Sequence, residues 1–514
     1  MNNIKLLYID LFCGAGGTST GVEKATFLGA KCAKVIACVN HDANAIASHA
    51  ANHPDALHFT EDIRTLELSP LIRHTVAMQK KYPNAYLVLW ASLECTNFSR
   101  AKGGQPRDAD SRTLAEHLFR YIEAINPDYI LIENVEEFMC WGDLDENGKP
   151  VSRHKGTSYL RWVRNVRQYG YDFDWRLLNA ADFGAYTSRR RFFGQFARHG
   201  LPIAFPIPTY AKNGDTEGSV GCGITAAPSL FPGQYKKWKP VREVLDLSDE
   251  GESIFMRKKP LCEATLNRIY AGLVKFVAGG EKAFLIKWNS INQKTGKYVP
   301  PSIDDPCPTV ATQNRLGLAN ISFLSKQFSG DPSGKNISIE QPAGAITCKD
   351  HHAFVTAFYG NGFNRSLESP APTIKTHDNI GLVVNKFLMN PYSFKSDGSS
   401  IDKPCFTLIA RMDKMPPYLI STEEGIGIRI YDTDSPMTRK IKEFMALYGI
   451  IDIKMRMLNV GELKRIMGFP TDYVLIGTQA EQRKFIGNAV EVNMSSALCT
   501  ALCQKINQIK ATAV

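Results

Sequence analysis

The sequence lacks several signals that would assign it to a specialised class of protein. No run of about 18 apolar residues is present, which argues against a membrane-spanning helix and a membrane partner. The N-terminus enters a strand-like segment without a signal-peptide pattern, so we expect a cytoplasmic protein. The twelve cysteines form no Cys-x-x-Cys pair and no Cys/His cluster at zinc spacing, so we predict neither a disulfide framework nor a metal site.

The composition is that of a globular chain. Its 514 residues are 44% hydrophobic and 22% charged, which is enough for two or three domains. The formal net charge of +10 permits a polyanionic partner and favours nucleic acid. A monomer is the default expectation.

The first two hundred residues alternate short apolar strands with amphipathic helices. Strands are predicted at 5–12, 34–39, 86–91 and 129–132, and apolar residues recur at helical spacing over 114–125. This alternation predicts a parallel sheet with helices on both faces, which is the α/β class.

The texture of the sequence changes after residue 205 to β-rich pieces with many Gly, Pro, Asn and Ser. We therefore predict three segments: 1–205 as the first part of a catalytic domain, 206–445 as an inserted domain, and 446–514 as the part that completes the catalytic domain. The last segment is predicted to be helical over Arg456–Met467, with a final helix starting at Phe485.

The inserted segment contains a four-fold repeat between about residues 284 and 420. Its units share the order apolar, acid, any residue, Pro, small, any residue, usually Thr, apolar. Each unit is predicted to be a strand, a loop and a returning strand, with Phe-led strands starting near Phe284, Phe323, Phe354 and Phe387. The loops are candidates for reading a nucleic-acid sequence, whereas a hairpin that only builds a stack explains any single loop equally well. The units are 303–310, 339–346, 367–374 and 401–408.

A Gly-rich turn, Asp10–Gly17, follows the first predicted strand and precedes a helix. Its glycines permit a tight turn and let a ligand approach backbone N–H groups at a helix start. Asn40 and Asp42, after the second strand, can bond ribose hydroxyls, and Asp62 can accept a hydrogen bond from an adenine amino group. The arrangement predicts a site for a nucleotide-like cofactor, although helix capping explains each polar residue taken alone.

Cys95 follows the apolar run 86–90 and is the candidate nucleophile, because a strand end would deliver its thiolate to a site. A thiolate can add to an electron-poor ring carbon such as C6 of a pyrimidine. The next predicted strand ends in Glu133 and Asn134. A protonated carboxyl at Glu133 would relieve charge at N3 of a cytosine, while Asn134 fixes the loop.

Arg189 and Arg191 stand at i and i+2 on a segment predicted to be extended. Their side chains would point to one side and could hold a base carbonyl and a phosphate. A solvated basic surface is the alternative. In duplex DNA, the base must first be flipped out of the stack for its C6 to be reached.

Together these residues resemble one family, the DNA (cytosine-5) methyltransferases. The resemblance implies a Rossmann-like, S-adenosylmethionine-dependent methyltransferase fold, with the β-rich repeat-containing insertion as a target-recognition domain. The segments that carry it follow the family's order and cover about half of the chain. They are Asp10–Gly17, Glu94–Ser99, Asp110–Arg112 with Arg120, Glu133–Val135, Arg189–Arg191, Arg456–Pro470 and Gly487–Val490.

The resemblance also implies a reaction. Cys95 would attack C6 of a flipped-out cytosine in double-stranded DNA, a methyl group from S-adenosyl-L-methionine would go to C5, and β-elimination would release 5-methylcytosine. The enzyme would act as an orphan or beside a cognate restriction endonuclease. Glu133, Asn134, Arg189 and Arg191 would complete the catalytic set. The residues implied for cofactor binding are Asp10, Phe12, Gly14, Ala15, Gly16, Gly17, Asn40, His41, Asp62, Ile63 and Asn488.

Departures from the family pattern surround these residues. Glu94 and Thr96 replace the usual Pro and Gln, Asn40 and His41 replace a glutamate and an aromatic residue, and Tyr186-Thr187 replaces Pro-Gln. A carboxylate beside the thiol raises its pKa if both are desolvated. We interpret Glu-Cys-Thr as the signature of a bacterial or phage branch. Two other hypotheses stay open: an RNA cytosine methyltransferase, and a sequence-specific DNA-binding protein that has lost catalysis.

Overall fold

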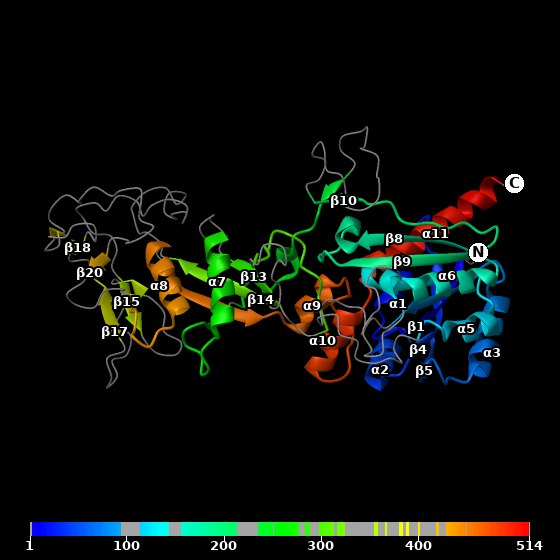
Figure 1. Ribbon diagram of the computed structural model, residues 1–514, viewed down its shortest axis with the longest axis horizontal. Helices are drawn as coiled ribbons and strands as arrows, with labels where there is room; N and C mark the ends of the chain where they lie inside the picture. The colour runs from blue at the N-terminus through cyan, green and yellow to red at the C-terminus, as the bar shows by residue number, and fades with distance from the viewer. Residues whose placement is uncertain are drawn as a thin grey trace. The chain divides into compact units, whose positions relative to one another are not determined.

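The chain divides into two compact units. Unit 1 comprises Met1–Leu247, Ile303–Arg315 and Leu458–Val514, and unit 2 comprises Ser248–Ser302 and Leu316–Met457. The N-terminal and C-terminal segments, blue and red in Figure 1, therefore belong to the same unit. The computed structural model describes residues 3–93, 114–142, 156–212, 235–249, 251–275, 277, 283–287, 298–312, 316–323, 354–357, 365–366, 380–383, 387–389, 399–400, 418–420, 428–448 and 450–512.

Among the described residues, a seven-stranded sheet forms the centre of unit 1 (Figure 1). Its order is β5-β4-β1-β6-β7-β9-β8, and only β9 runs antiparallel to its neighbours. The carboxyl ends of the parallel strands thus meet along one edge, where α/β sheets bind ligands. The strands are β1 (Leu6–Leu11), β4 (Ala33–Asn40), β5 (Leu57–Thr60), β6 (Tyr86–Ser92), β7 (Tyr129–Asn134), β8 (Tyr171–Asn179) and β9 (Arg190–Arg198).

Helices cover both faces of this sheet, which confirms the predicted α/β class. Apolar side chains of α3, α5 and α6 share one core with Leu7 and Ile9 of β1, while those of α1, α2 and α11 share the other with Leu6 and Tyr8. No helix among the described residues is long and apolar enough to cross a bilayer. The helices are α1 (Gly17–Lys24), α2 (Ala43–Asn52), α3 (Leu68–Lys81), α5 (Leu118–Ile125), α6 (Thr157–Gln168), α9 (Val460–Ile466), α10 (Gln479–Asn488) and α11 (Val492–Thr512).

Shorter elements of unit 1 connect these layers. The pair β2–β3 is antiparallel and the pair β10–β11 is parallel. The 3₁₀ turn η3 ends at Gly184, whose φ of 80° is the left-handed conformation that glycine adopts without strain. These elements are β2 (Thr26–Phe27), β3 (Ala30–Lys31), η2 (Glu136–Cys140), η3 (Ala180–Phe183), β10 (Tyr210–Ala211), β11 (Lys236–Lys237) and η4 (Val241–Val244).

The C-terminal helices start at other residues than the apolar spacing predicts. Arg456 belongs to strand β21, and α9 begins only after Asn459, whose side chain forms a capping box with Glu462. Phe485 lies inside α10, which begins after its own capping residue, Thr478, and the final helix is α11. Both predicted helix starts were wrong because the caps, rather than the apolar residues, set where each helix begins.

Unit 2 contains helices where the sequence predicts only β-rich pieces. Buried Leu266, Ile269 and Leu273 form one stripe of α7, which shares a core with α8 and a four-stranded antiparallel sheet, β12-β21-β14-β13. The prediction failed because Gly and Pro around these helices dominated the composition. These elements are α7 (Glu263–Lys275), α8 (Pro436–Tyr448), β12 (Glu252–Ser253), β13 (Ala283–Lys287), β14 (Leu316–Phe323) and β21 (Ile450–Met457).

The predicted Phe-led strands of the repeat are only partly correct. Phe284, Phe354 and Phe387 lie at or next to the start of β13, β15 and β18, whereas Phe323 ends β14 instead of starting a strand. Two three-stranded antiparallel sheets, β16-β15-β17 and β19-β18-β20, involve the described parts of the repeat. Their strands are β15 (Phe354–Ala357), β16 (Arg365–Ser366), β17 (Ile380–Val383), β18 (Phe387–Met389), β19 (Ser399–Ser400) and β20 (Tyr418–Ile420).

The first repeat unit, 303–310, forms no regular returning strand. It belongs to unit 1, where Cys307 makes a single parallel bridge to Thr187. The N–H of Cys307 donates to the carbonyl of Tyr186, and the N–H of Ser188 donates to the carbonyl of Cys307. This unit thus lies against the segment that leads into β9. The other three repeat units lie outside the described residues.

Candidate active site

The ends of β6 and β7 lie side by side. Ser92 at the end of β6 pairs in parallel register with Glu133, and the side-chain amide of Asn134 donates to the carbonyl of Leu93 at 3.4 Å. The Asn134 side-chain oxygen accepts from the N–H of Val135 at 2.8 Å. The predicted nucleophile, Cys95, is two residues beyond Leu93 and lies outside the described residues, as does all of Glu94–Ser99.

Glu133 is buried beside two arginines. Its side chain is 7% exposed, and its Oε1 lies 3.4 Å from Nε of Arg191. Burial raises the pKa of Glu133, and the positive charges of Arg189 and Arg191 only partly offset this effect. All three side chains line one small cavity. The structure therefore brings together three of the five predicted catalytic residues, and a fourth, Asn134, follows Glu133 directly in the chain.

The arginines reach Glu133 because of the antiparallel strand. β9 begins at Arg190 and places Phe193 opposite Glu133, so Arg191 lies two residues from that pair. Arg189 is buried, and its Nη1 donates to the carbonyls of Gly487, at 3.1 Å, and Val310, at 3.4 Å. Arg189 therefore links three distant segments of unit 1. Its predicted contact with a base or a phosphate stays a prediction.

The glycines of the loop after β1 have two different environments. Gly14 and Gly16 have φ of 53° and 101°. A Cβ on Gly16 would lie 2.3 Å from the Tyr473 hydroxyl oxygen, and a Cβ on Gly17 would lie 2.4 Å from the Val490 carbonyl oxygen. At Gly14, no atom of the described residues other than its chain neighbours lies within 4 Å of the Cβ position. The loop is thus packed closely on one side and open at Gly14.

Three of the other predicted cofactor residues are committed to local contacts. Asp10 is fully buried, and its carboxylate accepts from the Ser19 hydroxyl at 2.9 Å. The carboxylate of Asp62 accepts from the guanidinium and the N–H of Arg64, and these bonds lower its pKa. The carbonyl of Ile63 accepts from the Tyr121 hydroxyl at 2.9 Å. An adenine amino group would have to share Asp62 with Arg64.

The remaining cofactor candidates surround the carboxyl edge of the sheet. Phe12, at φ 59°, follows β1, and Ala15 is buried in the same loop. Asn40 ends β4, where its side-chain oxygen accepts from the N–H of Asp42 at 2.9 Å, and His41 beside it is exposed. Asn488 is exposed at the end of α10. Among these described residues, no hydrogen bond or ion pair joins one side chain to another, and their cofactor roles stay predictions.

Sequence reasoning missed two residues that contact the site. The hydroxyl of Tyr473 donates to the carbonyl of Ala15, which fixes the loop after β1. Glu491 is buried and lines the same small cavity as Glu133. It follows directly on the Gly487–Val490 segment, which was the available signal. The long-range partner of Tyr473 has no such signal in the sequence.

Comparison with known families agrees with this geometry. The profile described as C-5 cytosine-specific DNA methylase matches residues 6–217 and 389–504. The chain belongs to this family. The predicted family resemblance and the predicted Rossmann-like methyltransferase fold are thereby confirmed, whereas the Glu-Cys-Thr signature stays a prediction.

The curated proteins to which the chain is similar include proteins named Type II methyltransferases. Type II methyltransferase M.AgeI of Thalassovita gelatinovora is 33% identical over 224 residues, which are 43% of this chain and 46% of the relative. Type II methyltransferase M.XorII of Xanthomonas oryzae pv. oryzae is 31% identical over 236 residues, which are 45% of this chain and 50% of the relative. The chain spans about half the length of the curated relatives it matches.

Proposed function

We propose that this chain is a sequence-specific DNA cytosine C5 methyltransferase that methylates a flipped-out cytosine through a covalent Cys95–C6 adduct. The observation that supports this most directly is the buried Glu133, held beside Arg189 and Arg191 at the strand end next to the one that leads to Cys95. Addition of a thiolate to a cytosine requires an acid near the ring, and this arrangement supplies one in a chain that matches the C-5 cytosine-specific DNA methylase family.

Glu133 acts as the acid of the site. Because burial raises its pKa, the carboxyl keeps a proton more readily and can donate it toward N3 of the cytosine. This donation relieves the negative charge that enters the ring when a thiolate adds at C6. Arg191 orients the carboxyl, and Asn134 holds the end of β6 through the carbonyl of Leu93.

Cys95 supplies the nucleophile. Its thiolate forms a bond to C6, and the electron pair displaced from the C5–C6 double bond makes C5 nucleophilic. S-adenosylmethionine supplies an electrophilic methyl group when bound. Departure of the C5 proton to a base then allows the C6–S bond to break, which restores both the pyrimidine ring and the thiolate of Cys95.

The loop after β1 fits a bound nucleoside-like cofactor. At Gly14 the backbone has a positive φ and open space where a Cβ would lie, so a ligand can lie against the main chain. Phe12, Asn40, His41 and Asn488 would surround it, and Asp62 and Ile63 would face its base. The closely packed Gly16 and Gly17 hold the loop in place. Ala15, which lies between Gly14 and Gly16, is fixed by the hydrogen bond from Tyr473 to its carbonyl.

Double-stranded DNA is the proposed substrate, and unit 2 is the proposed target-recognition domain. The net charge of +10 supports a polyanionic partner. The similar proteins are named Type II methyltransferases, which supports a role beside a cognate restriction endonuclease, with an orphan methylase as the alternative. A cytoplasmic monomer is the simplest state for this activity.

The test is a nucleoside analysis. Purified protein is incubated with unmodified phage DNA and S-adenosylmethionine, the DNA is digested to nucleosides, and these are separated and identified by mass spectrometry. We expect 5-methylcytosine with the native chain and none with Cys95→Ala. A 5-methylcytosine peak in transfer RNA but not in DNA would favour the RNA hypothesis. DNA binding without any modified nucleoside would overturn the enzymatic proposal.

A further inference from the structure

Three polar side chains form one row across the sheet in unit 1. Asp10 on β1 is the register partner of Cys38 on β4, and Cys38 is the register partner of His58 on β5. Register partners in adjacent parallel strands project to the same face. Ser19 from α1 and His49 from α2 lie over this row, since both bond to it. The row therefore lies between the sheet and two helices.

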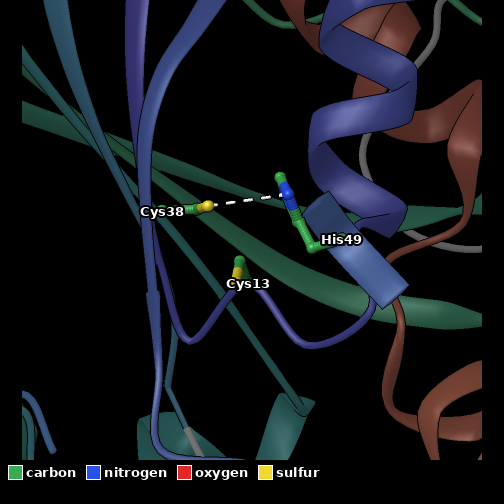
Figure 2. Close-up of side chains that lie close together, drawn as sticks. All are labelled: Cys13, Cys38 and His49. Atoms are coloured by element: carbon green, nitrogen blue, oxygen red, sulfur yellow. Dashed lines mark hydrogen bonds between the residues drawn. The ribbon is translucent and has the colours of Figure 1, made fainter. Parts of the chain in front are cut away.

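Two thiols and an imidazole converge at this place (Figure 2). The Sγ atoms of Cys13 and Cys38 and a ring nitrogen of His49 all lie within 4.8 Å of one another. Sγ of Cys38 lies 3.5 Å from Nδ1 of His49. Nε2 of His58 lies 3.0 Å from the same Nδ1 atom. Cys13, Cys38 and His49 are buried, whereas His58 is half-buried on the edge strand.

The second ring nitrogen of His49 contacts the Ser19 hydroxyl, which is in turn bonded to Asp10. Nε2 of His49 lies 2.9 Å from Oγ of Ser19, and the Ser19 hydroxyl donates to Oδ2 of Asp10 at 2.9 Å. Because the Ser19 proton goes to Asp10, the Ser19 oxygen accepts from Nε2–H of His49. The lone pair of Nδ1 then faces the thiols and His58. A ligand histidine with its far N–H bonded toward a carboxylate is the usual outer arrangement of protein metal sites.

Two thiolates and two imidazoles are a donor set that suits Zn²⁺. In a tetrahedral site with Zn–S of about 2.3 Å and Zn–N of about 2.0–2.1 Å, a sulfur and a nitrogen ligand lie about 3.5 Å apart. The Cys38–His49 separation of 3.5 Å equals this value.

We propose that Cys13, Cys38 and His49 bind a Zn²⁺ ion, and that His58 moves in as the fourth ligand. His58 lies 3.0 Å from Nδ1 of His49 but outside the group of three residues whose donor atoms all lie within 4.8 Å of one another. All four positions are then filled by protein, so the ion is structural rather than catalytic. Cys13 lies in the loop of Gly14–Gly17, and the ion would link that loop to β4, β5 and α2. The proposal stands independently of methyl transfer, because it rests on a donor set that would bind zinc in an inactive chain as well.

The experiment measures metal on the full chain, purified under reducing conditions without a metal-binding tag. Zinc is quantified by mass spectrometry, then exchanged for Co²⁺, whose thiolate charge-transfer and d–d bands report ligand type and geometry. We expect about one zinc per chain and a tetrahedral cobalt spectrum with thiolate bands. Cys38→Ser should lose the ion, and Ser19→Ala should weaken binding about 10- to 100-fold.

A second set of variants keeps the proposal testable if Cys38→Ser fails to fold. His58→Gln alters only a half-buried side chain of an edge strand and should weaken cobalt binding while the thiolate bands persist. Two matched controls should keep the ion. Cys499→Ser changes a second thiol cluster, Cys32, Cys499 and Cys503, and His74→Gln changes a histidine that bonds the Ile36 carbonyl.

Three results would overturn the proposal. The first is a reduced, folded chain that takes up neither zinc nor cobalt. The second is metal that is lost in Cys499→Ser but kept in Cys38→Ser, which would assign it to the other cluster. The third is a Cys13–Cys38 disulfide in non-reduced peptide maps of a metal-free chain that is active, because the pair would then be a redox site.

Discussion

Two clusters of polar side chains lie along the carboxyl edge of the same sheet, and different interactions offset the cost of burying them. Beside β7, the carboxyl of Glu133 is held by opposite charge, with Arg191 at 3.4 Å and Arg189 in the same cavity. Across β1, β4 and β5, thiols and imidazoles are joined by hydrogen bonds that end at Asp10. The first arrangement sets the pKa of a carboxyl group. The second places the sulfur and nitrogen atoms of thiols and imidazoles close together, where they could bind a metal ion.

This difference predicts different sensitivities. An ion pair responds to loss of charge and to pH, because neutralising one partner leaves the other buried and uncompensated. A cluster of thiols and imidazoles responds to metals and oxidants, because thiolate sulfur is their target. Substitutions at the β7 edge should therefore change catalysis and titration. Substitutions at the β1 edge should change metal content and the shape of the cofactor loop.

The largest expected effect tests the acid at the β7 edge. Glu133→Gln should lower the rate of methyl transfer by about 10²- to 10⁴-fold, because the amide cannot transfer a proton toward N3. Single-turnover assays with labelled cofactor measure this rate. Glu136→Gln is the matched control: its side chain is half exposed and 3.9 Å from Arg190, so activity should be kept. Wild-type rates in Glu133→Gln would remove the proposed acid role.

The β7 edge was also the part of the site that the sequence predicted best. Apolar runs that end in polar residues are typical of buried parallel strands, so Glu133 and Asn134 could be assigned to a strand end. The environment of Arg189 could not be predicted. Its bonds to Val310 and Gly487 join positions more than a hundred residues away, and no local pattern encodes such contacts.

The thiol and imidazole cluster, in contrast, could not be predicted from the sequence. A search for zinc spacing finds short intervals, but Cys13, Cys38, His49 and His58 come from a loop, a strand, a helix and a second strand. Only the parallel register of β4 and β5 brings Cys38 and His58 together. Likewise, the first repeat unit was predicted to be a strand, a loop and a returning strand, yet its Cys307 forms only a single bridge, to Thr187 in unit 1.

A smaller effect should distinguish two carboxyls of the β7 cavity. Glu491 precedes α11 and accepts from the N–H of Met494 at 2.8 Å; burial raises its pKa to about 7. Below about pH 4.5 both states are protonated. As the pH rises to about 7 the unfolded chain loses this proton first, so stability falls by roughly 3 kcal/mol in total. Glu491→Gln should remove this dependence.

The measurement is the thermal midpoint of both chains between about pH 5 and pH 8. The midpoint of Glu491→Gln should rise relative to the native chain as the pH increases. Glu481→Gln is the control: the capping bonds from Thr478 lower the pKa of Glu481, so its carboxylate is ionised in both states above about pH 5, and the midpoint of this variant should lie below that of the native chain by a constant amount across the range. Parallel curves for the native chain and Glu491→Gln would show that Glu491 titrates normally.

The smallest effect separates cofactor contact from packing in the loop after β1. Gly14→Ala adds a methyl group to open space, so it should cost only the left-handed strain of about 1–2 kcal/mol. Its cofactor affinity should nevertheless fall, because the methyl group occupies the side on which we place the ligand. Gly16→Ala is the matched control: its Cβ would meet the buried Tyr473 hydroxyl, which is bonded to Ala15.

Calorimetric titration with S-adenosylmethionine and thermal unfolding separate the two variants. Gly14→Ala should lose more affinity than stability, and Gly16→Ala should lose more stability than Gly14→Ala does. Equal affinity in Gly14→Ala and the native chain would place the cofactor away from this backbone. Zinc content should stay at the native level in Gly14→Ala, because no atom of Cys38 or His49 lies within 4 Å of the added Cβ. A loss of zinc there would mean that the loop and the metal site cannot be varied independently.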